Sequence, residues 1–156
     1  MKESLSELEK LVAINEIRDL MARYARLADE KRFTDLASLF TPTGTFTPHN
    51  VNGEVWSHME GREAIAKTIT ASVGPAIAIH HLFSYETTIL SPTSARSVIA
   101  MEDRLIHPDD EVLPSTETAF RTMHGFGHYH ADLVKIDGSW YISKLVQTRL
   151  KMDFTK

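Results

Sequence analysis

The sequence predicts a single α+β domain in which helices come first and an antiparallel sheet follows. Residues 5–30 keep apolar side chains at helical spacing and contain no Gly or Pro, which is typical of one long amphipathic helix. From residue 77 onward the chain is rich in apolar and β-branched residues and is divided by turn-forming residues. Helices followed by a run of strands indicate an α+β layout. At 156 residues, one domain spanning 1–156 is expected.

The N-terminal part is expected to begin with a helical hairpin. The helix over 5–30 has Ser4 or Ser6 as its candidate N-cap, and each is followed three residues later by a Glu, which is the capping-box pattern. A second, shorter helix is predicted over 33–40. It ends before Pro42, because the residue that precedes a proline disfavours helical backbone.

A short strand over 43–48 and a polar loop over 49–59 lead to a third helix, predicted over 61–73 and ended by Gly74-Pro75. The chain after this helix is expected to form an antiparallel meander that curls around the first helix. Asp137-Gly138, between the last two strands, is typical of a tight hairpin turn. The predicted strands span residues 77–90, 95–107, 116–135 and 140–150.

The composition narrows the classes of function. A net charge of −4, with scattered Lys and Arg, argues against a nucleic-acid partner, which requires a concentrated basic surface. No stretch approaches the ~20 apolar residues of a membrane span, and the first residues are charged, unlike a signal peptide. The absence of Cys excludes disulfides, thiolate nucleophiles and sulfur-ligated zinc. We therefore expect a cytoplasmic protein that acts on a small molecule, without a nucleic-acid or membrane partner.

A carboxylate and an imidazole carry the main functional prediction. Asp29 ends the first predicted helix, and His80-His81 opens a strand about fifty residues later. If the helix packs across the sheet, the carboxylate can orient the ring and raise its basicity, which makes it a proton-abstracting base near neutral pH. Adjacent strand residues point to opposite faces, so only one of the two histidines faces the helix.

Aromatic side chains are further candidates for the site. Tyr24 lies on the helix face that is expected to pack inward, where its hydroxyl can donate a hydrogen bond to a substrate oxygen or be satisfied in the core. Tyr129 and Phe83 are predicted to bind substrate as part of a pocket wall. Trp56, in the polar loop, is predicted to cover the pocket mouth, or alternatively to lie at a subunit interface.

A histidine cluster on the strand over 116–135 allows three interpretations. His128 and His130 share one face of the strand, and we interpret them as a polar wall that binds substrate. A His-x-His pair is also a metal-ligand geometry, with His124 or His80 as a third ligand, and a surface or interface position is the other alternative. No phosphate-cradling loop or nucleophile elbow accompanies these residues.

Several short strings, in this order and at this spacing, resemble the SnoaL-like branch of the nuclear-transport-factor-two-like superfamily, which includes scytalone dehydratase and hexachlorocyclohexane dehydrochlorinase. The resemblance covers nearly the whole chain. The strings that carry it are Ile17-Arg18-Asp19-Leu20, Asp35-Leu36-Ala37-Ser38-Leu39-Phe40, Gly61-Arg62-Glu63-Ala64-Ile65, His80-His81, Gly127-His128-Tyr129-His130 and Asp137-Gly138-Ser139-Trp140.

The resemblance implies a cone-shaped α+β barrel, with three N-terminal helices packed against a curved, mainly antiparallel sheet around a deep apolar pocket. It places a catalytic Asp at Asp29 and a catalytic His at His80, which therefore is expected to face the pocket. It implies no cofactor and no metal, and it implies association as a homodimer or homotrimer. Dehydrochlorinases of this family carry an Arg after a Ser-Lys pair on the last strand. Here Leu145 follows Ser143-Lys144, so we expect that electrostatic helper to be missing.

The leading hypothesis is a cofactor-independent, dehydratase-like lyase or isomerase. It would act on a small apolar cyclic or aromatic compound, with His80 as the base, Asp29 as its orienting carboxylate and Tyr24 as a hydrogen-bond donor. One alternative is a non-catalytic ligand-binding or assembly module, because the fold hosts both. Another is a metal-dependent enzyme that uses His128 and His130.

Overall fold

A computed structural model describes residues 4–156 of the chain. Three helices and six strands are found in this part of the chain, in the α+β order that the sequence predicts. The elements are α1 (Glu7–Asp29), α2 (Phe33–Ala37), β1 (Phe40–Pro48), β2 (Met59–Glu60), α3 (Arg62–Val73), β3 (Ile77–Ser91), β4 (Ser94–Ile106), β5 (Thr122–Ile136) and β6 (Ser139–Thr155).

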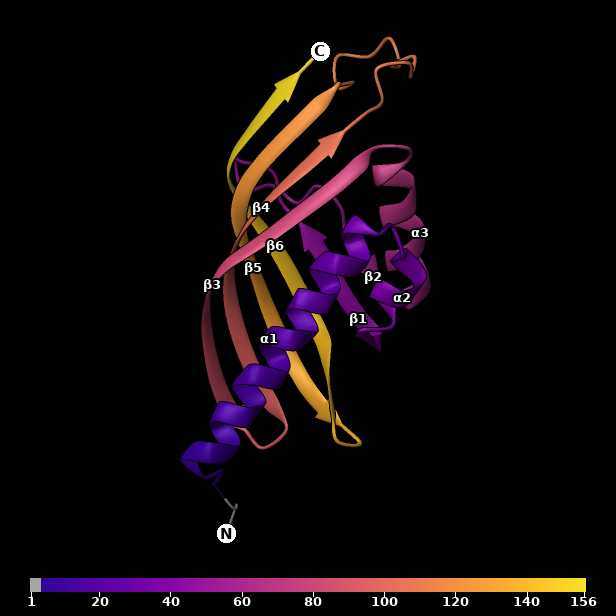
Figure 1. The fold of residues 1–156 in the computed structure, drawn as a ribbon. Coiled ribbons are helices and arrows are strands. Elements are labelled where there is room, and N and C mark those ends of the chain that lie inside the picture. Colours follow the sequence, from indigo (N-terminus) through magenta and orange to yellow (C-terminus); the bar gives the residue numbers. More distant parts are fainter. Residues whose placement is uncertain (1–3) are drawn as a thin grey trace.

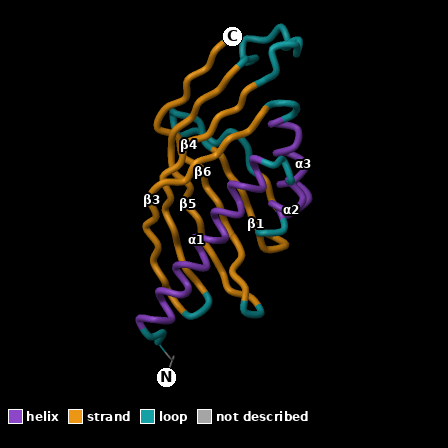
Figure 2. The backbone as a smooth tube through the Cα atoms, viewed as in Figure 1, coloured by secondary structure: helices purple, strands orange, loops and turns teal. Residues whose placement is uncertain are grey.

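The strands form one curved, unclosed sheet in the order β2-β1-β6-β5-β4-β3. All neighbours pair antiparallel except β1 and β6, which are parallel. The long helix α1 lies across one face of the sheet, while α2 and α3 sit beside β1 and β2 (Figure 1). The tube in Figure 2 shows strands β3 to β6 bending along their length around this helical layer. The expected layout of three helices on a curved, mainly antiparallel sheet is confirmed.

Helix α1 brings its C-terminal end to the sheet because one face of it is apolar. Its N-cap is Ser6, whose hydroxyl accepts from the backbone N–H of Glu9, while the Glu9 carboxylate accepts from the backbone N–H of Ser6. The sequence left Ser4 and Ser6 open, and the structure selects Ser6. Residues at helical spacing bury the inner face: Ala13, Ile17, Leu20, Met21, Tyr24, Ala25, Leu27 and Ala28. This burial fixes the position of Asp29, the last residue of the helix.

Replacing Ser6 by Ala is expected to lower the free energy of unfolding by about 1 kcal/mol, since it removes a side-chain cap from the first turn of α1. Urea unfolding followed by circular dichroism measures the difference. Ser4→Ala is the matched control, because it changes the same residue type two positions away. Equal stability losses in the two variants would show that the capping box contributes nothing.

The Asp137-Gly138 turn joins β5 to β6 as predicted. Both residues have positive φ angles, 49° and 82°, as a two-residue hairpin turn of the primed type requires. Ile136 pairs with Ser139 directly beside the turn. The turn therefore sets the register where β5 and β6 begin to pair.

Some element boundaries differ from the prediction. The second helix ends at Ala37 instead of residue 40, because Phe40 pairs with Ile142 and begins β1. The predicted loop over 49–59 ends in the short strand β2, where Met59 pairs with Phe46. These differences arise from long-range strand pairing, which outweighs local preference.

The last two strands also differ at their ends. The strand predicted over 116–135 begins at Thr122, because the residues before it form a turn, in which the Ala119 N–H donates to the Thr116 carbonyl, and not extended backbone. The final strand extends beyond residue 150 to Thr155, which pairs with Thr122. The added length of β6 lies beside the start of β5 and brings Met152 and Phe154 into the sheet. No helix within residues 4–156 is both long and apolar enough to cross a membrane.

Candidate active site

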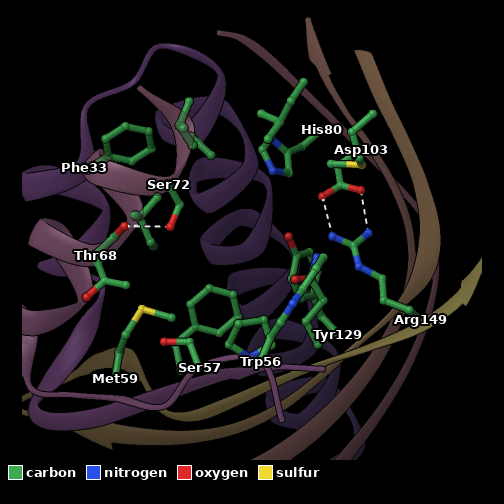
Figure 3. Close-up of a pocket in the computed structure, with 18 of the residues that line it drawn as sticks. Phe33, Trp56, Ser57, Met59, Thr68, Ser72, His80, Asp103, Tyr129 and Arg149 are labelled. Carbon is green, nitrogen blue, oxygen red and sulfur yellow. Dashed lines mark hydrogen bonds and ion pairs between the residues drawn. The ribbon is translucent and has the colours of Figure 1, made fainter. Parts of the chain in front are cut away.

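A cavity of about 400 Å³ lies between the helices and the sheet. Every helix and the strands β1 to β6 contribute to its wall (Figure 3). The lining is mainly apolar and aromatic, and includes Ala28, Phe33, Leu36, Phe46, Met59, Ile69, Val73, Leu105, Phe120, Met123, Met152 and Phe154. Such a volume, with a few polar groups in an apolar wall, is typical of a small-molecule site.

His80 and Asp29 meet at this cavity. The ring Nδ1 of His80 lies 2.9 Å from Asp29 Oδ1, and the His80 ring lines the cavity. The His80 side chain is 13% exposed and the Asp29 side chain 36% exposed, so the carboxylate reaches the ring from the rim. A carboxylate accepts hydrogen bonds, so Nδ1 carries the proton, and Nε2 has no hydrogen-bond partner within residues 4–156. The ring is thus held in the tautomer of a base.

His81 points to the opposite face of the sheet. Its Nδ1 lies 2.9 Å from Glu102 Oε1, and the other oxygen of Glu102 lies 3.0 Å from His124 Nε2. These two histidines hold the pKa of the Glu102 carboxyl below its usual range through hydrogen bonds. His80, and not His81, is therefore the histidine of the cavity.

Two tyrosines form an adjacent part of the wall. Tyr24 and Tyr129 both line the cavity, with their rings in an edge-to-face contact whose centroids are 5.5 Å apart. Burial raises the pKa of both hydroxyls. Both tyrosines are therefore neutral at physiological pH and able to donate hydrogen bonds to an oxygen in the cavity.

A buried ion pair completes the polar wall. Arg149 from β6 donates two hydrogen bonds to Asp103 from β4, at 2.6 and 2.9 Å, and both residues line the cavity (Figure 3). Their side chains are only 5% and 8% exposed. Two parallel N–H···O bonds are the strong form of an arginine–carboxylate pair. Both terminal nitrogens of the Arg149 guanidinium thus bond Asp103, while its buried Nε has no partner among the described residues.

Gly125 provides the space for this pair. A Cβ atom at this position would lie 2.6 Å from Asp103 Oδ1 and would also collide with Arg149 Nη1. Gly125→Ala is therefore expected to lower the free energy of unfolding by about 1–3 kcal/mol through overpacking. Urea unfolding measures the loss, and unchanged stability in Gly125→Ala would contradict the tight fit described here.

Three predicted site residues lie away from the cavity. His128 and His130 are on the outer face of β5, where His130 Nε2 lies 2.9 Å from Thr148 Oγ1, because strand alternation that turns Tyr129 inward turns its neighbours outward. Burial, with His128 and His49 nearby, lowers the pKa of His130. Phe83 is exposed and contacts the His81 ring on the same outer face. The structure thus does not bring these three side chains to the cavity.

Trp56 does reach the cavity, from the loop before β2. Its side chain lines the cavity while remaining largely exposed, so it lies at the mouth. The placement agrees with the predicted covering role, which stays a prediction. Within residues 4–156, no three His, Asp or Glu side chains converge in an arrangement that could hold a metal ion.

Sequence reasoning missed Asp103 and Arg149. Leu145 follows Ser143-Lys144 as the sequence shows, and a different arginine of that strand, Arg149, lines the cavity four residues later. A signal was available: Met101, Asp103 and Leu105 alternate on β4, so a charge occupies a position whose neighbours on the same face are apolar. A charged residue on the buried face of a strand indicates a partner or a function.

The sequence of this chain matches a known domain family. A family model for the SnoaL-like domain matches residues 9–146. The chain belongs to the SnoaL-like family. The match includes α2, α3, α1 except for its first two residues, and the His–Asp pair of this SnoaL-like domain, whereas Arg149 lies beyond it.

Solved structures agree with this fold. A protein named "putative scytalone dehydratase", from Novosphingobium aromaticivorans, superposes with a TM-score of 0.79 at 19% identity, covering 97% of this chain and 93% of that chain. A hexachlorocyclohexane dehydrochlorinase, LinA type 2, has a TM-score of 0.78 at 16% identity, covering 97% and 94%. LinA type 3 from Novosphingobium barchaimii has a TM-score of 0.75 at 18% identity, covering 96% and 94%. These likenesses establish the fold of this SnoaL-like domain.

Proposed function

We propose that this protein is a cofactor-independent lyase or isomerase, with dehydration of a small cyclic or aromatic hydroxy ketone as its reaction. The observation that carries the proposal is the 2.9 Å contact between His80 Nδ1 and Asp29 Oδ1 beside an apolar cavity. A neutral imidazole that is oriented by a carboxylate is the usual arrangement of a general base that works near neutral pH. The names of the similar solved proteins, a dehydratase and dehydrochlorinases, support the same class of elimination chemistry.

The reaction begins with proton abstraction. His80 Nε2 removes a proton from the carbon next to the substrate carbonyl, and the electron pair of the C–H bond forms an enolate. Asp29 accepts the Nδ1 hydrogen bond throughout and stabilises the imidazolium that results. The C–O bond to the β-hydroxyl then breaks, the enolate collapses to an enone, and the imidazolium proton leaves with the hydroxyl as water.

The tyrosines and the apolar wall assist this step. Tyr24 and Tyr129 are neutral donors placed together in the wall, where either can stabilise the oxygen on which negative charge develops. The apolar lining excludes bulk water and strengthens those hydrogen bonds. A double-bond shift would use the same residues, with the imidazolium proton returned to another carbon.

The compound 3-hydroxy-1-tetralone is a suitable test substrate, because loss of water from its ring yields 1-naphthol. We expect the protein to accelerate 1-naphthol formation, measured by absorbance, and to accelerate exchange of the protons at carbon 2 in heavy water, measured by nuclear magnetic resonance. Exchange without loss of water would support an isomerase and not a dehydratase.

The alternative, a ligand-binding module, makes a different prediction for the same experiment. It requires that 3-hydroxy-1-tetralone binds, as measured by calorimetry, while neither exchange nor dehydration is faster than in buffer. In that case His80→Ala would change affinity alone. Rate acceleration that disappears in His80→Ala would exclude the binding module.

A further inference from the structure

The Asp103–Arg149 pair lies directly beside the proposed base. Asp103 is the cross-strand partner of His80, and Gly125 is the partner of Asp103 on the next strand. Direct partners on an antiparallel pair have Cβ atoms about 4.5–5.5 Å apart on one face of the sheet. A second carboxylate therefore stands next to the His80 ring, in addition to Asp29 (Figure 3).

The charged and titratable groups that face His80 come from four elements. Helix α1 supplies Asp29 and Tyr24, and β4 supplies Asp103. Strand β5 supplies Tyr129, and β6 supplies Arg149. The cavity-lining residues of α2 and α3 are apolar or hydroxyl-bearing and carry no charge. With both tyrosines neutral, the local charges are two carboxylates and one guanidinium.

We propose that Arg149 is a positioning residue that neutralises Asp103, so that Asp29 is the only carboxylate acting on His80. This inference deepens the proposed function and rests on the role of His80 as the base. Both hydrogen bonds of the Arg149 guanidinium go to Asp103, and Gly125 leaves room for them. The positive charge of Arg149 is therefore held against the carboxylate of Asp103. Asp103 is therefore charged and next to His80, but the charge of Arg149 offsets its stabilisation of the protonated imidazole.

The sign of the effect follows from electrostatics. A carboxylate without its cation stabilises the protonated imidazole, and a cation without its carboxylate destabilises it. Removing Arg149 should therefore move the protonation midpoint of the His80 ring to higher pH, and removing the charge of Asp103 should move it to lower pH. A role in structural support alone predicts no such opposed pair of shifts.

The test is the titration of the His80 ring by two-dimensional nuclear magnetic resonance of the intact protein, without any substrate. We expect the midpoint to rise by about one pH unit in Arg149→Met, which is about a tenfold change in proton affinity, and to fall by a similar amount in Asp103→Asn. The double variant Asp103→Asn/Arg149→Met and the charge-conserving Arg149→Lys should titrate close to the wild type. His81, on the outer face, is the internal reference and should not move.

Each outcome decides the question. Opposed shifts in the single variants, cancelled in the double variant, would establish the neutralising role. Equal midpoints in all folded variants would overturn it, as would shifts of the same sign. Should Arg149→Met fail to fold, Asp103→Asn against the double variant gives the same comparison, with the predicted fall present in one and absent in the other. Because the titration needs no turnover, its result is independent of whether the protein proves to be an enzyme.

Discussion

Replacing His80 by Ala is expected to lower turnover by about 100-fold or more while the fold is retained, which is the usual contribution of a general base. The ring is the only imidazole of the described residues that lines the cavity, and its Nε2 is free to accept a proton. The measurement is the rate of 1-naphthol formation from 3-hydroxy-1-tetralone, with circular dichroism to confirm that the variant is folded.

The chain offers a close control for this experiment. His81→Ala changes the same residue type at the next position of β3, on the outer face where it bonds Glu102, and we expect it to leave turnover unchanged. Asp29→Asn should lose a factor comparable with that of His80→Ala, because an amide at this position no longer selects the Nδ1–H tautomer. Retained activity in His80→Ala would contradict the proposed mechanism directly.

Replacing Arg149 by Met is expected to lower the free energy of unfolding by about 3–5 kcal/mol, since it leaves the buried carboxylate of Asp103 without its cation. Chemical denaturation at neutral pH measures this loss. The double variant Asp103→Leu/Arg149→Met should recover most of the stability, because replacing both members of a buried ion pair by apolar side chains is often neutral.

An exposed arginine provides the comparison. Arg96 pairs with Asp132 at 3.3 Å on the outer face, where both side chains are exposed to solvent. Arg96→Met should change the free energy of unfolding by less than about 1 kcal/mol, as is usual for surface ion pairs. Equal losses of stability in Arg149→Met and Arg96→Met would show that burial adds nothing to the energetic role of the Asp103–Arg149 pair.

Much of the architecture could be predicted because local signals agree with one another. The periodicity of α1, its capping box at Ser6 and the Asp137-Gly138 turn each follow from residue types within a few positions. Boundaries that depend on distant partners could not be predicted in the same way. The strand β1 begins at Phe40 because of Ile142, which is about a hundred residues further along the chain.

The part of the site that could be predicted from the sequence consists of residues whose type indicates their chemistry. Asp29 and His80 were singled out by their place at the end of a helix and the start of a strand, and the structure brings them into contact. The prediction placed His128 and Phe83 at the cavity. Strand alternation puts His128 on the opposite face from Tyr129, and Phe83 on the opposite face from His80. The error came from treating neighbouring strand residues as one group, when only alternate residues share a face.

The sequence by itself determined the helix–strand order, the turn chemistry, and the positions of Asp29 at a helix end and His80 at a strand start. The tertiary structure decided which side chains meet. The register of β3 turns His80 inward, and a β-bulge beside Leu150 lets both Arg149 and Met152 line the cavity, although three residues apart they would otherwise point to opposite faces. Register and bulges are set by pairing between distant strands, so no local pattern encodes which face a polar residue takes.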